Sequence, residues 1–220
     1  MSEMLTWQEI EQIIGAIDTG SRSGLRARAA LQLANSGLTS GEIVRARREH
    51  VRDLDRQGAI HIPTRARGQN VPLRDEVCTA LREWLAAAPD SEWLLCTYAR
   101  GSEGNPISDG DVRAAVDRAA EAAGFAADEV SPTRIRESYA WTMAQRGASA
   151  QDVAEILGFK QLRSTERIMR APAPNLGERV RGLSTQRPLP AHAAEDELHA
   201  LREEVEKLER RVRELERASP

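Results

Sequence analysis

Basic side chains that could bind phosphate gather in two stretches of the sequence. Residues 45–74 hold eight bases against three acids, and residues 130–187 hold ten bases against five acids. Arginine and lysine bind nucleic-acid phosphates electrostatically, whatever the base sequence. Acidic segments balance these stretches elsewhere, the layout expected if one face meets phosphates and another stays solvated. The alternative is compositional bias toward arginine, because only Lys160 and Lys207 among the 31 basic residues are lysines.

Other reactive residue types are sparse. Cys78 and Cys96 are too few and too far apart for a disulfide framework or a metal cluster, so we expect them to be small buried residues. The two tyrosines are Tyr98, in a possible strand, and Tyr139, which we expect in the core. We therefore predict no metal site and no cofactor.

Net charge and hydropathy restrict the class of protein. The 220 residues carry a net charge of −3, and all of it lies in residues 191–220, which leaves 1–190 neutral. The chain is 40% hydrophobic and 30% charged, and it has no run of the roughly 18–20 apolar residues that a membrane span needs. Its first residues have no basic n-region or apolar h-region, so we expect no secretory signal. We expect a cytoplasmic, nucleoid-associated protein without a membrane partner.

Hydrophobic spacing and capping signals predict a mainly helical body. Thr6 and Glu9 form a capping box before the first helix, which Gly20 ends. AIHIP, TRARGQN and VPL predict an antiparallel β-hairpin, and WLLCTY at 93–98 is a third strand or a helix end. The expected fold is mainly α, with a small antiparallel hairpin or three-stranded sheet. The further helices are expected at 23–36, from Ser40, and at 75–88, 108–123, 132–145, 150–157 and 161–169.

The carboxyl-terminal part has a different composition. We predict a body over residues 1–172, a Pro/Ala-rich linker over 173–193 and a coiled-coil helix over 194–218. A β-branched residue at heptad position a with leucine at d favours a parallel two-stranded coil, so a homodimer is expected and a tetramer stays open. The alternative is one amphipathic helix packed on its own body. The seam consists of Leu198, Leu201, Val205, Leu208, Val212 and Leu215.

Five segments, in order, make the body similar to the catalytic domain of the tyrosine recombinases, the phage integrase family. They are LTWQEIEQII for the first helix, GLTSGEI for the Gly-Leu-Arg-x-x-Glu segment, the hairpin ending NVPL, SPTRIRESYAW for the His-x-x-Arg helix, and ILGFKQLRSTERIM for the Leu-Gly-His segment and nucleophile helix. The resemblance covers residues 4–170. It implies that family's fold and binding to double-stranded DNA.

The resemblance also implies a chemistry from which this sequence departs. In the family a tyrosine attacks a DNA phosphodiester, arginines and histidine-type donors stabilise the phosphoryl oxygens, and a lysine assists the leaving hydroxyl. Arg136 stands at its motif position, while the hairpin lysine maps to Arg65 or Arg67, which cannot act as a general acid. On this basis we expect no enzymatic activity. The departing positions are Thr39 for the first arginine, Thr133 for the first histidine, Phe159 after Leu-Gly and Ile168 for the nucleophile.

The function expected from these features is non-catalytic DNA binding with an architectural or regulatory role, by a protein oligomerised through its coil. The resemblance places the phosphate contacts on the helices and hairpin around the motif positions. The expected contacts are Arg136, Arg134, Arg65, Arg67, Arg45, Arg48, Lys160, Arg163 and Arg167, with Arg47 in the same basic stretch.

Three alternative functions stay open. One is an active recombinase that uses another nucleophile or assembles its site across subunits. Another is a helix-turn-helix regulator, because AQDVAEILGFKQLRSTERIMR has a glycine-centred two-helix pattern that would direct Gln161, Arg163, Ser164 and Arg167 to the major groove. The third is an adaptor that acts through its coil and no longer binds DNA.

Overall fold

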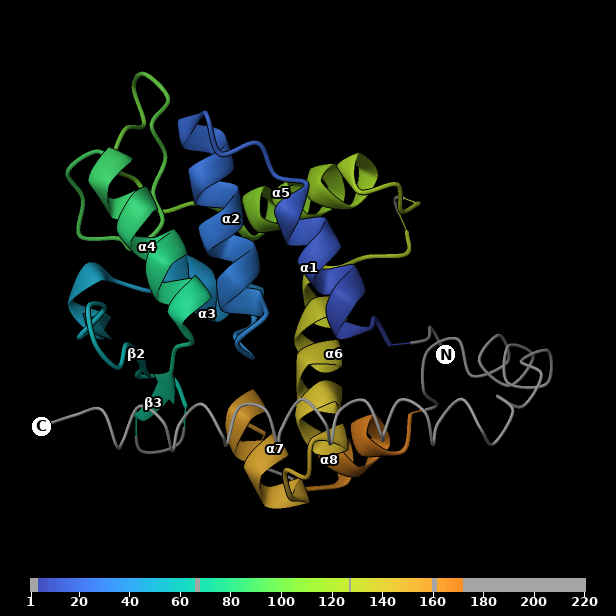
Figure 1. The fold of residues 1–220 in the computed structure, drawn as a ribbon. Coiled ribbons are helices and arrows are strands. Elements are labelled where there is room, and N and C mark those ends of the chain that lie inside the picture. The colour runs from blue at the N-terminus through green and yellow to red at the C-terminus, as the bar shows by residue number, and fades with distance from the viewer. Residues whose placement is uncertain (1–3, 66–67, 127, 160–161, 172–220) are drawn as a thin grey trace, which may run out of the picture. The chain divides into compact units, whose positions relative to one another are not determined.

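The computed structural model describes residues 4–65, 68–126, 128–159 and 162–171 of the chain (Figure 1). Contacts along the chain divide it into two units, 1–174 and 175–220, and the described residues all belong to the first. The predicted linker (173–193) and coiled coil (194–218) lie outside the described residues.

Helices make up most of the described unit, and a serine or threonine caps the amino end of most of them. Thr6, Thr39, Ser108 and Ser149 each form a capping box with an acid three residues on, which satisfies otherwise unpaired backbone N–H groups. The sequence predicted every one of these helices except one short 3₁₀ turn, most of them to within about two residues at each end, although the first helix stops at Gly15 and not at the predicted Gly20. They are α1 (Trp7–Gly15), α2 (Arg22–Ala34), α3 (Ser40–Arg45), the 3₁₀ turn η1 (Arg48–His50), α4 (Asp75–Ala87), α5 (Asp109–Ala122), α6 (Pro132–Gln145), α7 (Ala150–Leu157) and α8 (Leu162–Met169).

A small antiparallel sheet completes the fold, with β1 (Val51–Arg52), β2 (Ala59–Ile62) and β3 (Gln69–Pro72) in that order. Ile60 pairs with both Val51 and Val71, which fixes the register of the predicted hairpin. The expected fold class, mainly α with a three-stranded antiparallel sheet, is confirmed.

The strand that joins the predicted hairpin is β1, and not the segment 93–98 that was considered as a third strand. That segment makes only isolated bridges, from Trp93 to Arg47 and from Cys96 to Pro106. Its backbone bonds go to two different partners, since Leu94 N donates to Ala46 O at 2.9 Å and Thr97 N donates to Asn105 O at 2.8 Å. Leu94, Leu95 and Cys96 are all fully buried, so the apolar run at this point serves core packing.

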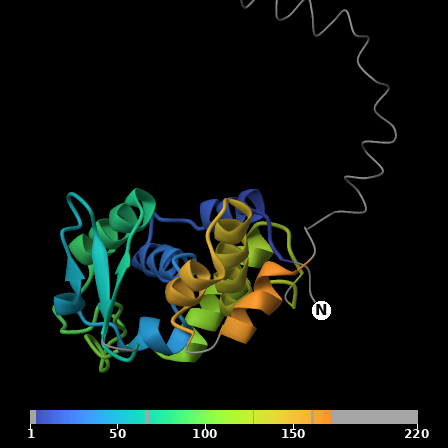
Figure 2. The same ribbon diagram turned by 90° about the horizontal axis from the view of Figure 1, so that it is seen from below.

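The core divides into two clusters. The larger cluster surrounds α2, which packs against α4, α5 and α6, and it includes both cysteines as predicted, Cys78 and Cys96. The smaller joins α6, α7 and α8 through side chains such as Trp141, Leu157 and Ile168. Seen from below, the sheet lies to one side of the unit and α7 and α8 lie to the other (Figure 2). No helix among the described residues is long and apolar enough to span a membrane.

Candidate nucleic-acid interface

Two buried arginines from distant parts of the sequence meet at one backbone carbonyl. Arg65 follows β2 and Arg136 lies on α6, and both donate to the carbonyl oxygen of Gly37, each over 2.9 Å, from Nη2 of Arg65 and Nε of Arg136. Gly37 ends the turn after α2 with φ +88°, a conformation that favours glycine. We call Arg65, Arg136 and their carboxylate partner Glu42 the arginine cluster.

Arg65 ties the hairpin to α3 and α7. Its Nε lies 2.7 Å from Oε1 of Glu42, its Nη2 lies 3.1 Å from Oε2 of the same carboxylate, and its Nη1 donates to Ile156 O over 2.9 Å. The Arg65 side chain is only 3% exposed. Gly158, at φ +63°, allows this close approach, because a Cβ there would lie 2.7 Å from Nε of Arg65. Arg65 therefore fixes the positions of three segments at once.

Arg136 ties α6 to the turn after α2 and to the end of α7. It donates to the carbonyl oxygens of Gly37 and Leu157, and its guanidinium lies 5.2 Å from the centroid of the Phe159 ring. Burial lowers the pKa of Arg136, the charge of Glu42 raises it, and the neighbouring Arg65 lowers it again. In this structure the two guanidinium groups predicted to contact DNA use their donors inside the protein.

Glu42 balances only one of the two positive charges. Burial alone would raise the pKa of its carboxyl, but hydrogen bonds from Arg65 and from the Thr39 backbone, with the charge of Arg65, lower the pKa below its ordinary value. Glu42 is thus held ionised, and the three groups together carry one net positive charge. Glu42 belongs to the GLTSGEI motif, and the Thr39–Glu42 capping pattern is the sequence signal that predicts its position at the start of α3.

Of the motif positions that depart from the family, Thr39 and Phe159 contact members of this cluster. Thr39 is exposed and caps α3, where its hydroxyl accepts from the backbone of Glu42. Thr133 is exposed in the first turn of α6, and Phe159 packs over Arg136. Ile168 is fully buried in the smaller core cluster. The structure thus brings the predicted motif segments together.

The remaining predicted contacts lie on the surface or outside the described side chains. Arg45 is exposed and reaches back to Gly41 O, and Arg167 is exposed and lies 2.7 Å from Oε1 of Glu137. Arg48 is half-buried and donates to Pro89 O, while Arg134 is half-buried and donates to Glu129 O. The side chains outside the described set are those of Arg67, Lys160 and Arg163, and of Gln161 and Ser164 from the helix-turn-helix alternative.

Each of the two tyrosine rings has an arginine guanidinium group over its face. Tyr139 is half-buried, with the guanidinium of Arg74 at 5.6 Å from its ring centroid, and burial raises the pKa of its hydroxyl. Tyr98 is half-buried beneath Arg26, at 4.8 Å. The prediction of a core position for Tyr139 thus holds only in part.

The chain matches the model of the phage integrase family over residues 3–173. The chain belongs to the phage integrase family. Among curated relatives of this integrase-family chain is the type 1 fimbriae regulatory protein FimB of Escherichia coli strain K12, 26% identical over 169 residues that cover 73% of this chain and 80% of FimB. Tyrosine recombinase XerA of Thermococcus kodakarensis is also 26% identical over 169 residues, which cover 76% of this chain and 57% of XerA.

Solved structures give the same fold for this integrase-family domain. A crystal structure of XerA recombinase matches with a TM-score of 0.68 and 17% identity, over 85% of this chain and 67% of that one. XerH recombinase bound to palindromic difH substrate, in a post-cleavage complex, matches with a TM-score of 0.67 and 18% identity, over 81% of this chain and 52% of XerH. The resemblance stated from the sequence is therefore confirmed.

The sequence-based prediction that the chain is not an enzyme is wrong. It rested on single motif positions, namely Thr39, Thr133, Phe159 and Ile168. The family match extends over the whole domain, and the relatives that carry it include tyrosine recombinases, which are enzymes. Substitutions at individual positions do not outweigh that membership.

Proposed function

We propose that this integrase-family protein binds double-stranded DNA through the surface around the arginine cluster and acts in DNA recombination or in its regulation. The observation that carries the proposal is the convergence of the hairpin, α3, α6 and α7 on Gly37, with two guanidinium groups against one carboxylate. A net positive centre attracts phosphate, and arginines on the elements around it would supply the contacts.

We assign these contacts to arginines on neighbouring elements, of which Arg45 and Arg167 are exposed and Arg134 is half-buried. Arg45 lies three residues after Glu42 on α3, and Arg134 lies two residues before Arg136 on α6. Arg167 bonds to Glu137, the neighbour of Arg136. Arg65 and Arg136 hold the segments that present these side chains. Several DNA-bound recombinases share this fold, among them XerH on difH substrate, which supports a DNA partner.

Self-association completes the proposal. The heptad seam of Leu198, Leu201, Val205, Leu208, Val212 and Leu215 would join two bodies, and linking two weak DNA-binding modules raises the effective concentration of the second. The name of FimB as a regulatory protein supports a regulatory role, and a DNA-bound protein of this kind would associate with the nucleoid.

The test is a fluorescence-anisotropy titration of random duplex DNA at several salt concentrations. We expect a negative slope of log K against log salt. Arg45→Ala and Arg134→Ala should each weaken binding and make that slope less steep by about one, because each removes one phosphate contact. Arg82→Ala is the matched control, since Arg82 is exposed on α4 and pairs with Asp55 away from the cluster.

Three results would count against this function. Full-length protein that shows no DNA binding at low salt would favour the adaptor alternative. Arg82→Ala weakening binding as much as Arg45→Ala would mean that charge anywhere on the surface suffices. Base preference that changes on substitution of Gln161 or Ser164 would instead favour the helix-turn-helix alternative.

A second candidate function is strand transfer itself, which the names of the tyrosine recombinase relatives favour. A nicked suicide duplex traps a covalent protein–DNA product that survives denaturation. Such a product would support this candidate, and Tyr98→Phe and Tyr139→Phe would show whether either tyrosine of the chain is the nucleophile. Binding without any trapped product would count against it.

A further inference from the structure

The outer face of the small sheet carries a row of polar side chains. Ile60 and Val71 form a buried pair on the inner face. The next pair, His61 and Asn70, therefore lies on the outer face, because successive side chains of a strand point to opposite faces. His50, the residue before β1, continues the row, with its ring centroid 6.2 Å from that of His61. The sheet lies at one side of the unit (Figure 2), and Asn70 is exposed.

This row restrains the amide of Asn70. Nδ1 of His61 lies 3.0 Å from Oδ1 of Asn70, and because an amide oxygen only accepts, the proton is on Nδ1. The His61 ring is itself held, since His50 lies edge-on beside it and a Cβ at Gly68 would lie 2.7 Å from its Cε1. Nδ1 of His50 in turn accepts from the backbone N of Arg47 over 3.2 Å. An exposed asparagine on a strand is thus fixed through a chain of contacts.

The restrained amide keeps hydrogen-bonding capacity for a ligand. His61 uses one lone pair of Oδ1, which leaves the second lone pair and both N–H donors of the Asn70 amide. The Asn70 side chain makes no other hydrogen bond within the part of the chain that the structure describes. Its acceptor and donors match N6 and N7 of adenine in the major groove, where asparagine makes a bidentate base contact. A two-stranded β-ribbon also fits that groove.

Asn70 directly follows a residue that touches the arginine cluster. The preceding residue, Gln69, accepts from Nη1 of Arg65 over 3.2 Å and donates to Glu155 O over 2.8 Å. Neighbouring residues of a strand are only about 3.3 Å apart along its axis. One duplex can therefore receive a base contact from Asn70 and phosphate contacts from the arginines around the cluster.

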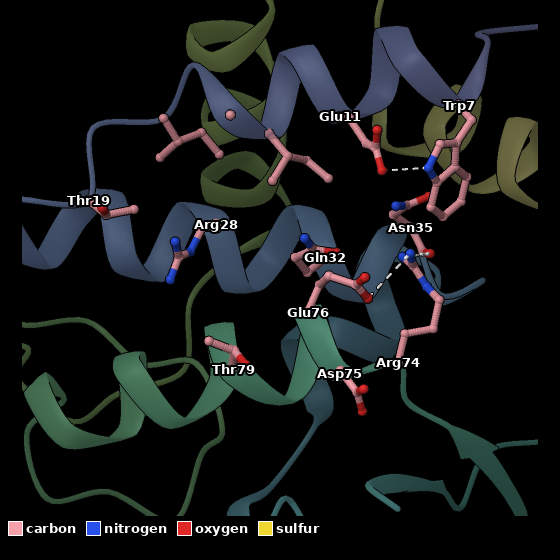
Figure 3. Close-up of a pocket in the computed structure, with 13 residues that line it drawn as sticks. Trp7, Glu11, Thr19, Arg28, Gln32, Asn35, Arg74, Asp75, Glu76 and Thr79 are labelled. Carbon is pink, nitrogen blue, oxygen red and sulfur yellow. Dashed lines mark hydrogen bonds and ion pairs between the residues drawn. The ribbon is translucent and has the colours of Figure 1, made fainter. Parts of the chain in front are cut away.

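The outer face also carries positive charge that is available to DNA. Its strand positions hold Arg52 and no acid, and Arg52 is exposed and has no ion-pair partner among the described residues. Arg74, beside the cavity of about 540 Å³ between α1, α2 and α4, in contrast faces Glu76 at 3.8 Å (Figure 3). The acids nearest to β1 along the chain, Glu49 and Asp53, lie outside the strand. The face therefore favours a polyanion as its occupant.

Two acids restrict how a duplex lies on this face. Asp152 and Glu155 of α7 are exposed, and together with Asn70 they line a cavity of about 380 Å³ at the edge of β3. Their charge repels phosphate from that edge. The DNA backbone that flanks the contacted base is therefore expected on the β1 side, against Arg52.

We propose that Asn70 reads an adenine in the major groove of the duplex that the surface around the arginine cluster binds, and that His61 positions its amide. Arg52 supplies a neighbouring phosphate contact, which carries affinity but no base preference. This inference rests on the proposed DNA binding and adds to it a residue that determines sequence preference.

The experiment selects binding sequences for the full-length protein from duplexes with a randomised segment, and then measures affinity for the selected duplex by fluorescence anisotropy. We expect one adenine position at which Asn70→Ala lowers discrimination against other bases at least about fivefold, the lower end for a bidentate base contact. Affinity for random duplex and the salt slope should stay unchanged. Replacing that adenine by 7-deazaadenine removes N7, so it should weaken binding by the natural chain but not by Asn70→Ala.

Substitutions at His61 and Arg52 separate base reading from phosphate binding. His61→Phe keeps a ring without the donor and should lower the same discrimination, whereas His61→Asn, whose amide nitrogen can take the place of Nδ1, should retain more of it. A purely structural role of His61 would lower Tm and leave the base preference intact. Arg52→Ala should weaken binding to all sequences alike and make the salt slope less steep by about one.

Asn105→Ala is the matched control, because Asn105 is exposed in a loop outside the sheet, and it should change neither affinity nor preference. No base preference in the natural chain, an unchanged preference in Asn70→Ala, or full binding to the 7-deazaadenine duplex would overturn this inference while DNA binding itself stands. Absence of binding to random duplex at low salt would overturn the proposed function and this inference together.

Discussion

At the scale of single residues, Arg65 is the side chain on which the arrangement of the interface depends most. Its donors hold Glu42, Gly37 and Ile156 together. Arg65→Met should therefore lower the free energy of unfolding by about 3–5 kcal/mol, because it leaves the carboxylate of Glu42 without its main partner. Urea unfolding followed by circular dichroism measures this loss.

Arg45→Met is the control for that substitution. Arg45 is exposed on the same basic stretch, so its loss should change stability by no more than about 0.5 kcal/mol. A similar small change on Arg65→Met would show that the hairpin, α3 and α7 hold their positions without the buried ion pair.

Glu42 gives this ion pair a dependence on pH. The pKa of Glu42 is lower in the folded protein than its ordinary value, so its contribution to stability is present above that ordinary value and is lost as the pH falls through the folded pKa. Glu42→Gln should be less stable than the natural chain near pH 7, and the difference should shrink below about pH 4. Urea unfolding of both proteins across this range tests it, and a constant difference would contradict it.

The burial of Arg65 and Arg136 could not be predicted from the sequence. Arg65 and Arg136 stand in basic stretches, where local pattern reasoning expects solvent-exposed phosphate contacts. Their acceptor, Gly37 O, is 28 residues from one and 99 from the other. Only the tertiary fold brings that carbonyl to them, so the sequence predicted the segments correctly but not what the arginines do within them.

At the scale of elements, the left-handed residue after α7 fixes how that helix meets the hairpin. Gly158→Ala would place a Cβ 2.7 Å from Nε of Arg65, whereas a Cβ at Gly124, after α5, would meet nothing within 4 Å. Both positions have positive φ, so both substitutions carry backbone strain of about 1 kcal/mol or more. Gly158→Ala should cost clearly more in unfolding free energy than Gly124→Ala, and equal costs would show that Arg65 moves aside freely.

The helices could be predicted better than the sheet because their capping signals lie close together in the sequence. Capping boxes such as Thr6 with Glu9 and Ser149 with Asp152 lie within four residues, so they can be read directly from the sequence. The segment 93–98 has the composition of a strand, but its backbone pairs with Ala46 and Asn105 in turn. Val51–Arg52, the actual third strand, is too short to carry an alternating pattern.

At the scale of the whole molecule, the net charge differs between the body, which is expected to bind DNA, and the segment that holds the predicted coil. Residues 1–190 are neutral overall, and residues 191–220 carry the net charge of −3. A neutral body with a local positive centre should bind DNA weakly by itself, because electrostatic affinity grows with the number of phosphates neutralised. Self-association through the predicted coil would raise the apparent affinity without any new contact in the body.

That coupling can be tested by weakening the coil while net charge is kept. Leu201→Ala with Leu208→Ala removes two predicted d-position side chains and should turn the predicted dimer into a monomer, as measured by sedimentation equilibrium. Apparent DNA affinity should fall by about 10²-fold or more, and the salt slope should become about half as steep, because one body instead of two releases counterions. Lys207→Arg, at a predicted outward position, is the control. A monomer that binds as tightly and with the same slope as the natural chain would show that one body makes all the DNA contacts.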